Sequence, residues 1–325
     1  MELSVIIPVY CSQATLPELI ERLLAVLDDT GKSCEIVLVD DASTDDSWAT
    51  ICQWQQAHAE RIVAVQLMRN CGQHNALMCG LRLARGRYVI TMDDDLQNPP
   101  EEIPKLLGAI EAGRYDLVYG VPLQKQHASW RNLGSLLVSR FYRTIFASKV
   151  RLSSFRIIRR ELVAAIASYE LNYTFLDGLL AWNTQYIGQV PVEHRARSEG
   201  RSGYSLGKLL VLAINLFTNF SLLPLQLVSL LGFLTALGGF ALGAYYTYGH
   251  LSGRITVPGY ASTITAVFVL GGIQLLALGV MGEYLGRLHM NVNCKPQYTL
   301  RTVLGPTDRS LAPACGPVTP GDQPS

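Results

Sequence analysis

Two long stretches without a charged side chain restrict how this chain can fold. No Asp, Glu, Lys or Arg occurs between Lys208 and Arg254, or between Arg254 and Glu283. The first stretch is too long for one membrane span, and Pro224 divides it. We therefore expect an interfacial helix followed by a hairpin of two transmembrane helices. The expected positions are 204–220 for the interfacial helix and 225–248 and 262–282 for the spans.

Composition and charge agree with a membrane-bound chain. Only 16% of the residues are charged, and the mean hydropathy is positive, at +0.21. Cationic residues precede and follow the predicted spans, whereas the link between them carries only Arg254. By the positive-inside rule, both termini are expected in the cytoplasm and the link outside. The net charge of +1 gives no indication of a nucleic-acid partner.

The part of the chain before these stretches alternates between short apolar runs and segments with helical spacing. This alternation predicts an open α/β sheet, and such sheets bind ligands at the carboxyl ends of their strands. The β-branched run that ends at Pro8-Val9-Tyr10 reads as a central strand, buried on both faces. The predicted strands are 3–10, 34–39, 62–67, 88–92, 116–120, 152–158 and 184–192.

Acidic clusters follow two of the predicted strands. Asp40 and Asp41 come after the second strand, and Asp93, Asp94 and Asp95 come after the fourth. Three adjacent carboxylates repel one another, and a divalent cation such as Mg²⁺ or Mn²⁺ would remove that repulsion. In an extended segment, Asp93 and Asp95 can point one way and Asp94 the other. The alternative is an acidic loop that only caps the following helix, at Glu101-Glu102.

Gln97 offers a further neutral oxygen beside the three acids, so the expected metal ligands are Asp93, Asp95 and Gln97. Two basic segments could meet anionic groups. One is the glycine-bearing loop around Arg197 and Ser202. The other is 124–143, which contains Arg131 and Ser135 and reads equally well as an amphipathic surface helix.

Several motifs together resemble the family 2 glycosyltransferases of the GT-A fold, and among them the polyprenyl-phosphate glycosyltransferases. That group includes dolichyl-phosphate mannose synthase, the bactoprenol glucosyltransferases and undecaprenyl-phosphate 4-deoxy-4-formamido-L-arabinose transferase. The resemblance extends from the start of the chain to about Arg301. The matching segments are 4–10, 38–43, 69–74, 93–100, 197–205 and 282–287.

The resemblance implies a role for each matching position. The expected donor-binding residues are Pro8, Tyr10, Asp40, Asp93 and Asp94. The expected catalytic residues are Asp95, with Arg197 and Ser202 of the loop that closes on the donor and the lipid phosphate. The acceptor phosphate is expected to meet Arg131, Ser135 and Lys125.

The sequence departs from this family pattern at two places. Many members carry an Asp just before or within the Phe-Arg segment, where this chain has Ser153-Ser154 before Phe155. A phosphate monoester is already largely ionised near neutral pH, so an acceptor of that kind needs positioning more than deprotonation. An arginine that is often found after a glycine turn is replaced by Val121-Pro122, so we do not assign the sugar.

The predicted function is an inverting transfer of a sugar from a nucleotide-sugar, expected to be UDP-linked, to undecaprenyl (polyprenyl) phosphate at the cytoplasmic face of the bacterial inner membrane. The product would serve a cell-envelope glycan or lipid A. Mg²⁺ or Mn²⁺ is the expected cofactor, and a homo-oligomer, by resemblance a tetramer, is a further expectation. Alternatives are a non-catalytic membrane scaffold or lipid-sugar translocation partner, and a processive synthase, whose usual Gln-x-x-Arg-Trp motif is not found.

The domain organisation expected from these observations has four parts. They are a cytosolic GT-A domain at 1–203, an interfacial amphipathic helix at 204–223, a transmembrane hairpin at 224–287 and a cytosolic C-terminal segment at 288–325. Residues after Thr302 are rich in Pro and Gly and are expected to be disordered.

Overall fold

The computed structural model describes residues 1–122, 150–170, 174–195, 223–252, 260–292 and 296–306. The chain divides into two compact units. One unit joins Met1–Ser205 to Pro296–Ser325, and the other is Leu206–Lys295. The second unit is therefore inserted, in sequence, between two parts of the first.

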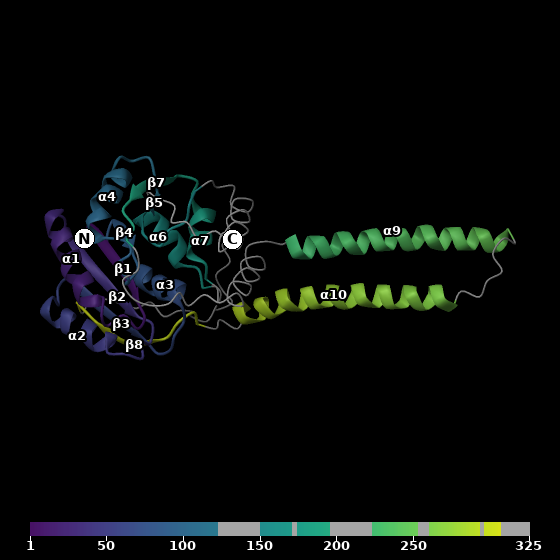
Figure 1. The fold of residues 1–325 in the computed structure, drawn as a ribbon, viewed down its shortest axis with the longest axis horizontal. Coiled ribbons are helices and arrows are strands. Elements are labelled where there is room, and N and C mark those ends of the chain that lie inside the picture. The colour runs from purple at the N-terminus through teal and green to yellow at the C-terminus, as the bar shows by residue number, and fades with distance from the viewer. Residues whose placement is uncertain (123–149, 171–173, 196–222, 253–259, 293–295, 307–325) are drawn as a thin grey trace, which may run out of the picture. The chain divides into compact units, whose positions relative to one another are not determined.

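The described part of the first unit is built on one mixed sheet with the strand order β7-β5-β6-β4-β1-β2-β3-β8 (Figure 1). Neighbours are parallel except that β6 runs antiparallel to β4 and β5, and β8 runs antiparallel to β3. The predicted open α/β sheet is confirmed. The predicted strand at 152–158 corresponds to β6, but its antiparallel direction was not predicted, and neither was β8. The strands are β1 (Leu3–Val9), β2 (Cys34–Asp40), β3 (Ile62–Leu67), β4 (Tyr88–Thr91), β5 (Leu117–Pro122), β6 (Arg156–Arg159), β7 (Ile187–Val192) and β8 (Leu300–Leu304).

Helices cover both faces of this sheet, with α1, α2 and α4 on one face and α3, α6 and α7 on the other (Figure 1). Alternate residues of β1 supply the two cores, because Val5 and Ile7 pack on the α1 side and Ile6 on the α3 side. The helices are α1 (Leu16–Asp29), α2 (Ser47–Ala57), α3 (Gln73–Leu83), the short 3-10 helix η1 (Pro100–Glu102), α4 (Ile103–Glu111), α6 (Arg160–Ala167) and α7 (Leu176–Asn183).

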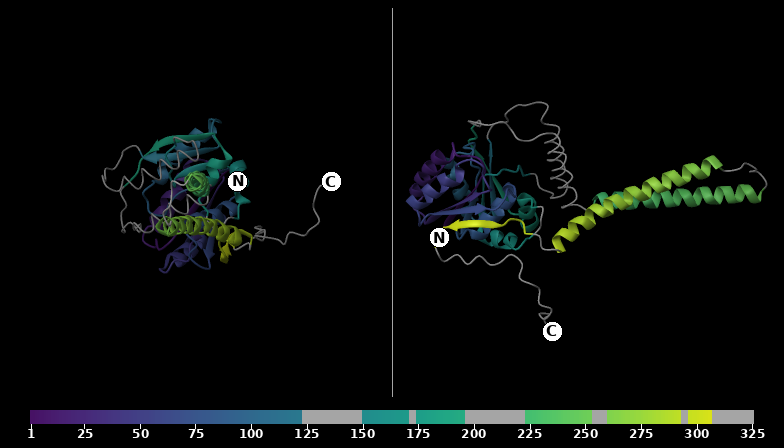
Figure 2. Two further views of the ribbon diagram at one scale, coloured as in Figure 1. Left: turned by 90° about the vertical axis from the view of Figure 1, so that its right-hand side faces the viewer. Right: turned by 90° about the horizontal axis from the view of Figure 1, so that it is seen from below.

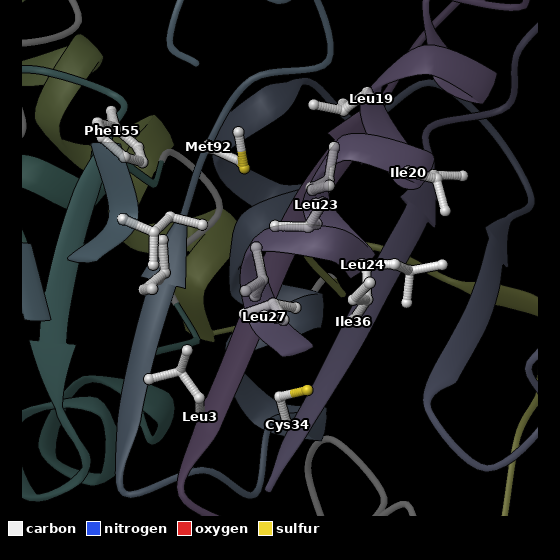
Figure 3. Packing of buried hydrophobic residues seen from close by; sticks show 14 of the residues in the cluster. Leu3, Leu19, Ile20, Leu23, Leu24, Leu27, Cys34, Ile36, Met92 and Phe155 are labelled. Atoms are coloured by element: carbon white, nitrogen blue, oxygen red, sulfur yellow. The ribbon is translucent and has the colours of Figure 1, made fainter. Parts of the chain in front are cut away.

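The leucines of α1 recur at helical spacing and form one apolar face. Figure 3 shows Leu19, Leu23 and Leu27 over the sheet, in one cluster with Ile36 of β2 and Met92 at the end of β4. All seven residues of β1 and of β2 are buried. Burying both faces of these strands leaves their ends as the places where polar side chains can reach ligands.

The strand β8 was not predicted, and it returns the chain to the sheet after the second unit. It pairs with β3, with Val65 opposite Val303 (β8 is also visible in Figure 2). Just before it, Tyr298 accepts a 3.1 Å hydrogen bond from Arg82 of α3. The prediction of disorder after Thr302 is wrong for Val303 and Leu304, because both residues pair with β3, a strand that is far away in the sequence. Residues 307–325 lie outside the described residues.

The second unit contains α9 (Leu223–Leu251) and α10 (Tyr260–Val292), which lie side by side in Figures 1 and 2. Segments Leu225–Tyr245 and Val269–Gly286 are long and apolar enough to cross a membrane, and neither is buried within the protein. Both predicted spans are therefore found as helices, although α10 continues beyond its predicted end. The expected interfacial helix falls almost entirely outside the described residues.

Two mid-helix glycines give a test of the packing between α3 and β1. A Cβ added at Gly80 would collide with the Cγ2 methyl of buried Ile6, whereas one at Gly108 of α4 would have nothing within 4 Å. We expect Gly80→Ala to destabilise the protein by about 1–3 kcal/mol through overpacking. Gly108→Ala, the matched control, is expected to stabilise it by about 0.5–1 kcal/mol, because alanine is the better helix former. Thermal unfolding of the two variants in detergent measures both effects, and equal midpoints would contradict the packing.

Candidate functional site

Strand register brings the two acidic clusters to one edge of the sheet. Val9, the last residue of β1, lies opposite Asp40 of β2. On the other side of β1, Ile6 lies opposite Thr91, the last residue of β4. The loop with Asp93, Asp94 and Asp95 therefore begins beside the end of β1, as the parallel arrangement requires.

Asp93 is held by two side chains from different parts of the chain. Gln73, the first residue of α3, donates to its Oδ1 at 2.6 Å, and the hydroxyl of Ser154 donates to its Oδ2 at 2.5 Å. Burial raises the pKa of Asp93, and the hydrogen bond from Ser154 works against that rise. The nearby charge of Asp95 raises the pKa further, while that of Arg156 lowers it.

Asp94 is bound to the loop between β1 and α1. Its Oδ2 accepts hydrogen bonds from the backbone N–H of Tyr10, at 3.1 Å, and from the hydroxyl of Ser12. Its backbone oxygen accepts a 2.7 Å hydrogen bond from the hydroxyl of Thr15. Burial raises the pKa of Asp94 to about 6, against these hydrogen bonds. Asp94 therefore joins the acidic loop to the segment that presents Tyr10, a residue that is 49% exposed.

Asp95 and Gln97 lie in the same loop, where Gln97 donates its backbone N–H to Asp95 Oδ1 at 3.2 Å. The backbone oxygen of Gln97 accepts a 2.9 Å hydrogen bond from the N–H of Arg195. Arg195 follows β7, so this bond brings the chain just before the predicted basic loop to the acidic loop. The turn needs a left-handed residue, which is Leu96 with φ of 59°.

Asp40 and Asp41 have separate partners. Asp40 is fully buried, and its oxygens accept hydrogen bonds from the N–H of Ser43 at 3.2 Å and from Gln66 at 3.3 Å. Asp41 accepts from the N–H groups of Cys71, at 2.7 Å, and of Gly72, at 2.8 Å. Burial raises the pKa of Asp41, and these two amides oppose the rise. Asp41 thus braces the loop before α3, a role that the sequence analysis did not assign.

Of the predicted site residues, the described ones fall at this one edge. Pro8 is buried in β1 opposite Val39, and Tyr10 follows directly after the strand. Five predicted residues lie outside the described ones, so their roles stay predictions: Lys125, Arg131, Ser135, Arg197 and Ser202. The sequence analysis missed Ser12, Gln73 and Ser154 as partners of the acids. Gln73 lies within the matching segment 69–74, and Ser154 lies where the sequence departs from the family pattern.

The oxygen ligands at this edge suit a hard cation whose remaining ligands are water and substrate phosphates. Within the ranges that the structure describes, no group of three or more His, Cys, Asp or Glu side chains is arranged to hold a metal ion. Asp93 and Asp95 are nevertheless close enough for the charge of one to raise the pKa of the other. A Mg²⁺ or Mn²⁺ bound by one or two such carboxylates is normally completed by water and substrate phosphates.

Comparison with known proteins identifies the domain. Residues 4–164 match the family model described as glycosyl transferase family 2. The fold is similar to crystal structures of glucosyl-3-phosphoglycerate synthase from Mycobacterium tuberculosis. In its complex with Mn²⁺, UDP and phosphoglyceric acid, the identity is 21% and the TM-score 0.51, over 67% of this chain and 78% of that one. In the complex with Mn²⁺, UDP-glucose and phosphoglyceric acid, they are 22% and 0.50, over 67% and 79%.

At these identities, the structural likeness establishes the fold, and the family match establishes the kind of domain. The mixed open sheet, with its acidic loop at the carboxyl end of β4, is the GT-A arrangement that the sequence predicted. The chain therefore carries a glycosyltransferase domain of family 2 with the GT-A fold, and it is an enzyme that uses a nucleotide-sugar donor.

Proposed function

We propose that this enzyme transfers a sugar from a UDP-sugar to undecaprenyl phosphate at the cytoplasmic face of the bacterial inner membrane. The observation that carries the proposal is the insertion of two exposed apolar helices within a glycosyltransferase chain whose last strand, β8, rejoins the catalytic sheet. An enzyme with a water-soluble acceptor has no need of such helices. An enzyme whose acceptor is anchored in the bilayer has to stay beside it.

The return of β8 also supports the hairpin topology. Because β8 pairs with β3, the chain segments before α9 and after α10 belong to one domain. They must therefore lie on the same side of a membrane, and two spans satisfy that condition. Both windows are apolar and unburied, and they lie far from the N-terminus, unlike a core helix or a signal sequence.

The donor side of the proposal uses the edge formed by β1, β2 and β4. Tyr10 is exposed beside the acidic loop and offers a ring to a nucleotide base. UDP and UDP-glucose are bound in the structures of the mycobacterial synthase with the same fold, which favours a UDP-linked donor here. Asp40 is assigned to the nucleoside by family resemblance. Its burial implies that it acts by shaping the β2–α2 loop.

Asp93 and Asp95, with the amide oxygen of Gln97, would hold Mg²⁺ or Mn²⁺, in keeping with the Mn²⁺ of the mycobacterial structures. When bound, the cation supplies positive charge to the diphosphate that leaves with the nucleoside. The protein orients the two substrates so that a phosphate oxygen of the acceptor attacks the anomeric carbon from the face opposite the leaving group. The configuration at that carbon is inverted.

An ionised acceptor also accounts for Ser154. In many polyprenyl-phosphate transferases, a carboxylate occupies this segment, whereas Ser154 here donates a hydrogen bond to Asp93. A phosphate monoester with a second pKa of about 6 is already a competent nucleophile near neutral pH. Arg197, with Arg131 or Lys125, would then offset the charge of two approaching phosphates, and Ser202 and Ser135 would contribute hydroxyl groups. The tetramer implied by resemblance stays a prediction.

The acceptor is tested by supplying labelled UDP- and GDP-sugars with Mn²⁺ to the purified full-length chain. Undecaprenyl phosphate and phosphoglyceric acid are offered in parallel as acceptors. We expect one sugar per lipid, at a rate at least ~100-fold above that with the soluble acceptor, in line with the differential binding that remote substrate groups provide. Transfer to phosphoglyceric acid alone would refute the lipid acceptor. A polymer would indicate a processive synthase, and no transfer would indicate a non-catalytic partner.

Replacement of Asp95 tests the cation site. We expect Asp95→Asn to reduce sugar transfer by at least ~100-fold, because loss of a metal ligand should cost at least as much as loss of a group that only supports one. The protein should still fold, because Asp95 lies in a surface loop. Asp29→Asn, at the C-terminal end of α1, is the matched control and should leave transfer unchanged. Full activity of the Asp95 variant with normal Mn²⁺ dependence would remove Asp95 from the site.

A double-mutant cycle tests the link between Asp94 and the donor loop. Ser12→Ala and Asp94→Ala each break the hydrogen bond between these residues, so both should raise KM for the nucleotide-sugar. Since the bond is lost only once, the double variant should fall short of the summed single effects, with a coupling of about 0.5–3 kcal/mol. The measurement is KM for the donor at saturating acceptor. Strictly additive effects would show that Asp94 affects donor binding independently of Ser12.

A further inference from the structure

We propose that Arg156 and Asp177 are positioning residues for the metal site. In this view, the buried ion pair fixes the orientation of Asp93 and leaves its charge available to the cation. The inference rests on the metal site of the proposed function. Neither residue was singled out from the sequence, and neither touches the reacting groups in the mechanism above.

The pair lies inside the protein, where Arg156 of β6 is opposite Thr91, the last residue of β4 before the acidic loop, and Asp177 belongs to α7. The side chains of Arg156 and Asp177 are 2% and 9% exposed, and Nη1 of the arginine contacts Oδ1 of the aspartate. The hydroxyl of Tyr119, from β5, donates to the same Oδ1 at 2.8 Å. The guanidinium carbon lies 5.7 Å from the centre of the Tyr119 ring. Such an enclosed ion pair is costly to desolvate, so a gain in stability does not by itself account for it.

A continuous series of hydrogen bonds connects this pair to Asp93. Arg156 lies opposite Thr91 in the antiparallel pairing of β6 with β4, and its Nε donates to Thr91 Oγ1 at 3.0 Å. That hydroxyl donates to the backbone oxygen of Ser154 at 2.7 Å. The hydroxyl of Ser154 in turn donates to Asp93 Oδ2 at 2.5 Å. Arg156 therefore fixes the segment whose side chain sets the direction of the Asp93 carboxylate.

The contribution of Asp177 is to neutralise the charge of Arg156. The charge of Arg156 acts on Asp93, where it counteracts the rise that burial gives to the pKa of Asp93. While Asp177 pairs with Arg156, the positive charge of the guanidinium is neutralised. The carboxylate of Asp93 is then available to bind a cation. If Asp177 were neutral, the buried guanidinium would be drawn to Asp93 and would compete with the cation. Groups that support metal ligands commonly act in this way.

The direct test measures Mn²⁺ binding instead of turnover. Full-length Asp177→Asn in detergent is titrated with Mn²⁺ in the presence of UDP, and free Mn²⁺ is followed by electron paramagnetic resonance. We expect the dissociation constant to rise roughly tenfold, the lower range for loss of a group that supports a metal ligand. The matched control is Asp116→Asn, which removes the partner of Arg159 at the other end of β6, 3.9 Å away and partly exposed. Its Mn²⁺ affinity should match that of the unaltered chain.

A second variant decides the matter if Asp177→Asn fails to fold. Thr91→Val keeps the shape of a buried strand residue but removes the hydroxyl between Arg156 and Ser154. It too should weaken Mn²⁺ binding. An unchanged dissociation constant in a folded Asp177→Asn, or in Thr91→Val if the former does not fold, would reduce the pair to a structural element and overturn the inference. If the unaltered chain bound no Mn²⁺ with UDP, the metal site of the proposed function would itself be refuted.

Discussion

Burial of the central strands on both faces is the constraint on which the rest of this molecule depends. β1 and β2 are apolar along almost their whole length and lie between two layers of helices. Polar side chains are then found near the strand ends, with Ser4 and Glu35 hydrogen-bonded to each other near the starts of β1 and β2. Because β1, β2 and β4 are parallel and adjacent, their carboxyl ends meet at one edge, and the acids that follow them are gathered there. The apolar stretches of these strands therefore confine the acids of the site to the strand ends and loops at the carboxyl edge of the sheet.

The acids at that edge serve the structure as well as the proposed chemistry. Asp94 binds the loop after β1, Asp41 binds the loop after β3, and Asp93 binds both the start of α3 and the segment before β6. Asp94 and Asp41 thus hold loop backbone through its N–H groups, whereas Asp93 joins two segments through their side chains. Burial makes these groups harder to ionise, as the raised pKa values of Asp41, Asp93 and Asp94 show. A cation and the phosphates of a donor would complete an arrangement that the loops have already been shaped to hold.

The sequence was sufficient for features that depend on local pattern. β-branched runs placed the central strands, helical spacing placed α1 and α3, and charge-free stretches placed α9 and α10. The acidic motif could be found because three adjacent carboxylates at the end of a strand repel one another unless a cation offsets their charge. The features that were missed all depend on partners far apart in sequence. Asp177 lies 21 positions from Arg156, Ser154 lies 61 positions from Asp93, and β8 follows its partner β3 by more than 230 residues. No local pattern reports such pairings.

The position of β8 bears on how the glycosyltransferase domain is joined to the two apolar helices. A domain that ended before its membrane helices would be tethered at one point and free to turn about it. Here the chain leaves the catalytic unit before α9 and rejoins its sheet after α10, with Tyr298 and Gln297 fixing the returning segment to α3 and to Thr174. Two covalent connections restrict rotation far more than one, because a loop closed at both ends has fewer conformations. For the proposed acceptor, which would diffuse only within a bilayer, such a restriction would reduce the entropy lost when the two substrates are brought together.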